Sequence, residues 1–155
     1  MKIPKLKKIE FNNRKKEFDV FYKSGQKVTL HFGQLGIQSN LLAAGVDPES
    51  KGIAFFYKTE TGAEDFVPYD IPLILAKDPD YLFQIEVEEL TADIKKKMES
   101  KGITKKFLAR SLGTSDIQIQ RLLNADNPNK NFLQLNKIAH ILGLNLSLKL
   151  QKMAA

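Results

Sequence analysis

The chain has 155 residues, enough for one ordinary domain or two small ones, and its 43% hydrophobic content suffices for a packed core. The absence of cysteine excludes disulfides and thiolate metal sites, and no apolar run approaches the ~20 residues that span a bilayer, so a cytoplasmic protein is expected. The net charge of +6 is uneven: residues 1–88 carry 12 Lys or Arg against 13 Asp or Glu, whereas residues 89–155 carry 12 against 5. That C-terminal excess suits contact with a polyanion, although helical domains also have solvated, lysine-rich faces.

The first third of the chain is predicted to form antiparallel strands. Residues 8–11, 18–22 and 27–32 contain strand-forming side chains, and the last of these segments alternates apolar and polar residues. Between the second and the third, residues 23–26 have the glycine-containing composition of a hairpin turn.

A second hairpin is expected further along, from residues 53–57 to residues 65–69. Pro68 cannot donate to a strand ladder, so its strand should lie at a sheet edge or end there. Short helices are expected at residues 34–46 and 70–77.

Helical periodicity begins near residue 89. Thr91 is expected to cap a helix over residues 91–101, which Gly102 ends. The fold class predicted is therefore α+β, with a small antiparallel-sheet domain over residues 1–88 and an all-α domain over residues 89–155.

The next segment has the spacing of two short helices joined by a tight turn. Thr104 can cap the first helix, and the small Ala109 lets the two backbones approach. Gly113 stands where a left-handed conformation is needed, and Ser115 or the preceding threonine can cap the second helix. Ile119, with an apolar residue three further on, turns one face of that helix into the core.

This pattern matches the helix-turn-helix spacing and resembles the phage-repressor (Xre-like) family over residues 90–143. The resemblance implies flanking helices at residues 91–101 and about 132–142, the latter packed through Leu133, Leu135, Ile138 and Leu142. Lys105 stands where the family usually has a phosphate-contacting Gln, and Thr114 where it usually has Val or Ile.

The resemblance further implies that the second helix of the motif, over residues 115–124, reads bases in the major groove of double-stranded DNA. The base-reading candidates are Ser115, Asp116, Gln118 and Arg121. The phosphate-contact candidates are Lys105, Lys106, Arg110 and Lys130. The alternative is a helical module used for protein contacts, which the carboxylate of Asp116 favours because it repels phosphate.

Residues 144–150 alternate apolar and polar without a break and are predicted to form a strand after the stop at Gly143. This ending resembles that of some bacterial antitoxin-type regulators. Because a lone strand is unstable, it should pair with the N-terminal sheet, pack on its own helices, or pair with its twin in a homodimer.

Other chemistry finds little support in the sequence. His31 and His140 have no partners at metal-ligand spacing, no phosphate-binding loop is present, and the acidic residues form no acid–base pair, so neither a metal, a cofactor nor an enzyme is expected. The aromatic run at residues 55–57 suits a core as well as a ligand pocket. Residues 61–68 resemble part of a small bacterial α+β domain of unknown function that is sometimes fused to a helix-turn-helix.

Two functions remain open at this point. The first is a sequence-specific transcriptional regulator, a dimeric repressor whose N-terminal domain supplies dimerisation, an effector site or a partner surface. The second is an antitoxin-like protein whose N-terminal domain binds a toxin while the helix-turn-helix regulates its own operon.

Overall fold

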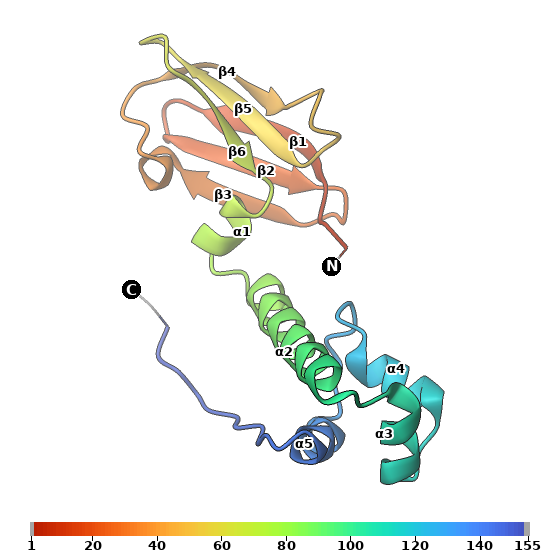
Figure 1. Ribbon diagram of the computed structural model, residues 1–155. Helices are drawn as coiled ribbons and strands as arrows, with labels where there is room; N and C mark the ends of the chain where they lie inside the picture. Colours follow the sequence, from red (N-terminus) through yellow and green to blue (C-terminus); the bar gives the residue numbers. More distant parts are fainter. Residues whose placement is uncertain (1, 154–155) are drawn as a thin grey trace. The chain divides into compact units, whose positions relative to one another are not determined.

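The computed structural model describes residues 2–153, which pack as two compact units, Lys2–Leu82 and residues 83–153 (Figure 1). The first consists mainly of antiparallel sheets and the second of helices, which confirms the α+β class. Over the described part of the chain, no helix combines the length and the apolar character needed to cross a membrane.

The first sheet contains β1 (Leu6–Asn12), β2 (Glu17–Tyr22) and β3 (Lys27–His31), all antiparallel and in chain order. The predicted hairpin turn is confirmed: Gly25 has φ +92°, a conformation that glycine adopts without steric cost. The short 3₁₀ helix η1 (Phe32–Leu35) follows β3.

The second sheet contains β4 (Leu41–Val46), β5 (Ala54–Thr59) and β6 (Glu64–Pro68), again antiparallel and in chain order. The expected second hairpin is β5–β6, and Pro68 ends the edge strand β6 as predicted. The helix expected over residues 34–46 is wrong beyond η1. Its second half is β4, because pairing with β5 overrides the weak local preference of a Leu–Ala–Gly segment.

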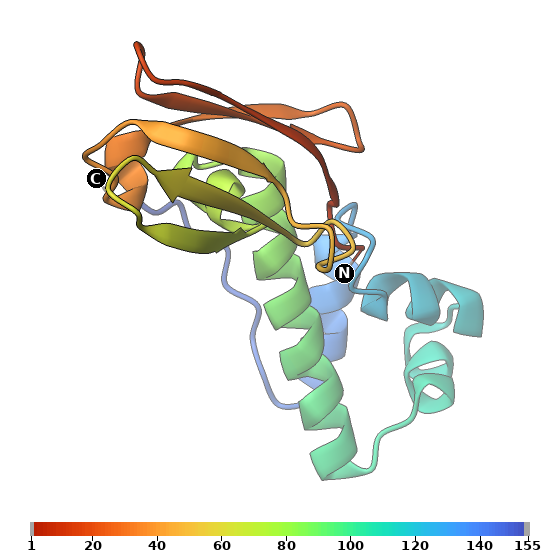
Figure 2. The same ribbon diagram turned by 90° about the horizontal axis from the view of Figure 1, so that it is seen from above.

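The core of the first unit lies between the two sheets, which lie one over the other in Figure 2. Phe18 of β2 is fully buried at its centre. Its ring centroid lies 5.0 Å from that of Phe32, 5.7 Å from that of Phe55 and 6.0 Å from that of Tyr57. Two of the three residues of the aromatic run therefore serve packing, which leaves Phe56 on the outer side of the second sheet.

Helix α2 (Pro79–Lys101) begins twelve residues earlier than expected, after the short α1 (Ile71–Leu75). The side chain of Asp78 accepts a hydrogen bond from the backbone N–H of Tyr81 at 2.8 Å, and Pro79 occupies the first helical position, where its missing N–H costs nothing. Thr91 is therefore not an N-cap: it is buried inside the helix, where its hydroxyl donates to the Val87 carbonyl at 2.6 Å. The boundary expected between residues 88 and 89 falls inside α2.

Three shorter helices complete the second unit: α3 (Lys105–Leu112), α4 (Asp116–Leu123) and α5 (Phe132–Ile141). They pack with α2 around one apolar cluster, in which the most completely buried side chains belong to Leu108, Ile119, Ile138 and Leu142. The closing helix falls where it was predicted. Leu133 is an exception to its expected packing, since 65% of it is exposed.

The C-terminal tail, residues 144–153, forms no strand in the described structure, which corrects the expectation for residues 144–150. Its first part is hydrogen-bonded to α5, and residues 147–149 line a groove against α2. The backbone N–H of Leu144 donates to the Ala139 carbonyl at 2.8 Å, and that of Leu146 donates to Asn136 Oδ1 at 3.0 Å. Leu146 packs on the core, whereas Leu148 and Leu150 are exposed. A strand needs a ladder partner, and none of the described strands provides one.

Candidate nucleic-acid interface

Local capping fixes α3, the turn and α4. Thr104 Oγ1 accepts from the backbone N–H of Phe107 at 3.1 Å, and Ser115 Oγ accepts from that of Gln118 at 3.2 Å, so both helices begin with a side-chain N-cap. Between them Gly113 has φ +64°, and its N–H turns back to the carbonyls of Ala109 and Arg110. The sequence left Thr114 and Ser115 open as caps, and Ser115 is the one used.

Packing of the two helices follows the predicted pattern. Ala109 is buried where α3 meets α4, and Ile119 and Leu122 turn into the shared core. Because these residues fix which side of α4 is inside, they also fix which side faces outward.

The four base-reading candidates, Ser115, Asp116, Gln118 and Arg121, are all exposed at α4. They are not equally placed. At about 100° per residue, Arg121 lies opposite the buried Ile119, whereas Asp116 and Gln118 lie at the two margins of the exposed face. The hydroxyl oxygen of Ser115 accepts the capping hydrogen bond, but its hydroxyl hydrogen can still be donated to a base.

The centre of that outward face holds a residue that the sequence reasoning missed. Ile117 lies in the first turn of α4 with 61% of its surface exposed, beside Arg121 and away from the core. Its position could have been found by counting helical positions from Ile119, because Ile117 lies about 160° around the helix from that buried residue.

The phosphate candidates fall into two groups. Lys105, Lys106 and Arg110 are exposed on α3, where Lys106 and Arg110 are four residues apart and share a face. Lys130 is half-buried in the loop after α4, and its ammonium donates to the carbonyls of Arg121, at 3.0 Å, and Asn124. Lys130 thus closes the end of α4 while one of its three N–H donors remains for a ligand.

The loop after α4 is shaped by its own asparagines. Asn124 Oδ1 accepts from the N–H of Asp126 and Asn127 Oδ1 from that of Asn129, each at 3.0 Å. These Asx turns hold the loop that carries Lys130. Over the described residues there is no cluster of three or more His, Asp or Glu side chains that could hold a metal ion.

A capped helix, a glycine turn and a second capped helix with an exposed polar face, enclosed by two further helices, define a helix-turn-helix DNA-binding domain. Residues 93–147 match the family model of the Cro/C1-type HTH DNA-binding domain, so the C-terminal part of the chain is a domain of that family. The match confirms the resemblance to phage-repressor-like domains. Neither the curated proteins nor the solved structures contain a match to the chain.

Proposed function

We propose that this protein is a sequence-specific DNA-binding transcriptional regulator that acts as a repressor, without enzymatic activity, in the cytoplasm. The observation that carries the proposal is the exposed, largely polar face of α4 in a domain of the Cro/C1 type. A compact domain seated in the major groove denies that stretch of DNA to other proteins, which is the simplest route to repression.

On this proposal α4 reads base edges directly. Arg121 donates to guanine O6 and N7, Gln118 pairs with adenine, and Asp116 accepts from the amino group of cytosine, with Ser115 beside them. Ile117 adds an apolar contact with the 5-methyl group of thymine. Lys105, Lys106, Arg110 and Lys130 hold the phosphates, which sets the position of α4 without reading sequence.

The regulator is proposed to act as a homodimer joined through its tail. Leu144, Leu148 and Leu150 are exposed, and with Leu146 they recur at every second residue. Antiparallel pairing with the same tail of a second copy would give this segment its missing ladder and cover the exposed leucines. Two copies related by a two-fold axis read a palindrome.

Selection of binding sites from random DNA at ~150 mM salt tests the proposal. An enriched palindrome with half-sites about one helical turn apart is the expected result. A variant with Gln118→Ala and Arg121→Ala, which keeps the core intact, serves as control and should lose the enrichment. Recovery of no sequence above background by the unchanged protein would reject sequence-specific binding.

A second candidate function, an antitoxin-like protein with a toxin partner, is favoured by the outer face of the second sheet. There Gly45, Phe56 and Phe66 lie in register across β4, β5 and β6, and 55% of Phe66 is exposed. Such an apolar row is typical of a protein-binding surface. The outer face of the first sheet differs, because ion pairs such as Lys27 with Asp19 at 3.4 Å cover it.

Co-purification from the native host distinguishes the two candidates. For the antitoxin-like function, one small chain should accompany the protein in equal amount, and Phe66→Glu should release it while Thr29→Glu, on the outer face of the first sheet, should not. Recovery of the protein without a stoichiometric partner, together with an enriched DNA site, would favour the plain repressor.

A further inference from the structure

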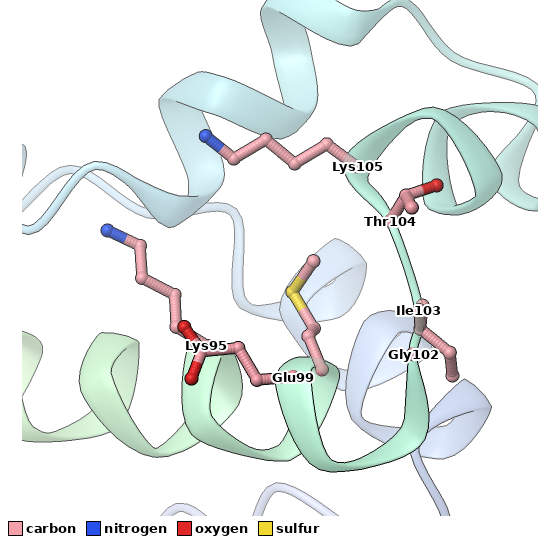
Figure 3. A pocket seen from close by; sticks show the side chains of 7 residues that line it. Lys95, Glu99, Gly102, Ile103, Thr104 and Lys105 are labelled. Carbon is pink, nitrogen blue, oxygen red and sulfur yellow. The ribbon is translucent and has the colours of Figure 1, made fainter.

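An open cavity of about 540 Å³ lies where the end of α2 meets the start of α3. Met98 and Ile103 contribute apolar lining, and Lys95 and Lys105 contribute two ammonium groups. Figure 3 shows both lysine side chains extending to the same side of the cavity, away from Gly102 and Ile103.

The position of Lys95 on α2 turns it toward the loop after α4. It follows Gln84 by about three helical turns, so the two residues share a face. On that face Gln84 Nε2 donates to the carbonyl of Ala125, in the same loop as Lys130, at 2.6 Å. The pKa of Lys130 is lowered, first by burial and then by the positive charge of Lys95. Lys95 thus shares the cavity with Lys105, and its charge acts on Lys130.

Two lysines line the cavity against one carboxylate, that of Glu99. Glu99 lines the same cavity, one turn beyond Lys95, yet within the described residues no ion pair joins it to Lys95 or Lys105. Thr104 and Lys105, at the start of α3, also line the cavity, so the positive end of the α3 dipole lies beside it. An anion bound in the cavity would offset the repulsion between the two ammonium groups.

We propose that the cavity is a phosphate-binding site and that Lys95, on α2, contacts a backbone phosphate of the bound DNA together with Lys105 and Lys130. This inference rests on the proposed function and extends it beyond the two helices of the motif. The sequence placed phosphate contacts on α3 and on the loop after α4, and gave no reason to separate Lys95 from its neighbours Lys96 and Lys97.

The test compares Lys95→Gln with Lys96→Gln, an exposed lysine of the same helix that does not line the cavity. Affinity for the selected DNA site is measured against salt concentration. The slope of log K against log salt is negative, and loss of one phosphate contact reduces its magnitude by ~0.9. This reduction is expected for Lys95→Gln and for Lys105→Gln. Lys96→Gln should keep the slope of the unchanged protein. Circular dichroism melting shows whether the variants remain folded.

A second measurement works without DNA. Inorganic phosphate is titrated into the isotopically labelled full chain at low salt while the amide signals of Gly102, Thr104 and Lys105 are followed. Saturable shifts that Lys95→Gln abolishes and Lys96→Gln preserves would support the site. Equal shifts in both variants, or an unchanged salt slope in Lys95→Gln with DNA still bound, would overturn it.

The two measurements separate the failure of this site from the failure of the proposed function. DNA binding that is indifferent to Lys95→Gln removes the phosphate site and leaves the regulator standing. Saturable binding of inorganic phosphate by a protein that binds no DNA supports the anion site, but overturns its assignment to a DNA phosphate.

Discussion

Arg121 is the residue whose place on α4 most directly suits base reading, because it lies opposite the buried Ile119. Arg121→Ala is expected to weaken binding to the selected site by about 1–3 kcal/mol and to relax selectivity at one base position. Binding to the site and to its single-base variants measures both effects. Arg14→Ala, which removes an exposed arginine of the first unit, is the charge-matched control. Unchanged selectivity in Arg121→Ala would remove it from the reading role.

Ile117 allows a sharper experiment, since one methyl group can be deleted from the DNA. Replacing the contacted thymine by deoxyuridine should cost the unchanged protein about 0.8 kcal/mol, the value of one buried methyl or methylene group. Ile117→Ser should bind both sites equally. Because Ile117 is exposed, the substitution should leave the melting temperature unaltered. A protein that ignores the methyl at every thymine would contradict the contact.

We expect Tyr22 to make the free energy of unfolding of the first unit vary with pH in the alkaline range. It is buried and donates its hydroxyl to the Tyr69 carbonyl at 2.6 Å. Burial, followed by the charge of Asp70, raises its pKa well above the ordinary value of 10.0. At a pH between the ordinary value of 10.0 and the raised pKa, the unfolded chain loses the phenolic proton whereas the folded chain keeps it. The free energy of unfolding therefore falls as pH rises, by up to about 1.4 kcal/mol per pH unit.

Denaturant unfolding of the unchanged protein and of Tyr22→Phe at pH 9 and pH 11 measures this term. The unchanged protein should lose more stability between the two conditions than the variant, which lacks the titrating group. At pH 9 the variant should be weaker by about 1 kcal/mol, the worth of the lost hydrogen bond. Equal pH dependence in both proteins would show that Tyr22 does not control it.

At the scale of elements, α4 depends on its cap. Ser115→Ala is expected to lower the stability of the DNA-free protein by about 1 kcal/mol, because the Gln118 N–H loses its acceptor. Ser111→Ala is the matched control, since Ser111 is exposed within α3 and caps nothing. Denaturant unfolding compares the two. If both variants match the unchanged protein, the cap contributes nothing to stability.

Elements governed by local rules were predictable from the sequence. Thr104, Ala109 and Gly113 act through backbone conformation and short-range packing, so their roles appear in the order of residues alone. The strands around Gly25 and Pro68 followed for the same reason.

Elements that depend on tertiary partners were not predictable from the sequence. Strand β4 exists because β5 pairs with it. The start of α2 was misplaced because an Asp–Pro pair suits a turn as well as a capped helix start, and here Asp78 caps the helix that Pro79 begins. The outward position of Ile117 required knowing which face of α4 is buried. The position of Lys95 could not be predicted either, because it depends on the packing of α2 against the loop after α4.

At the scale of the whole molecule, the tail offers the test of the homodimer. A double variant, Leu148→Lys and Leu150→Lys, changes side chains that are exposed in the single chain and so should not disturb its folding. It is expected to sediment as a monomer and to bind the palindrome far more weakly than a dimer does, with its half-site preference intact. Lys149→Ala, a substitution in the same segment off the leucine row, should remain dimeric. A double variant that still sediments as a dimer would place the interface elsewhere.

On the proposed phosphate contact, the lysine that closes α4 would couple DNA binding to the uptake of a proton. In the free protein, burial and the charge of Lys95 lower the pKa of Lys130, so its ammonium gives up a proton more readily than an ordinary lysine. A phosphate seated beside it favours the charged form and raises that pKa again. We therefore expect the protein to bind a proton together with DNA at alkaline pH, and its affinity for DNA to fall as pH rises in that range. The affinity of α4 for its proposed DNA site would then depend on the protonation of the same side chain that hydrogen-bonds to the end of the helix.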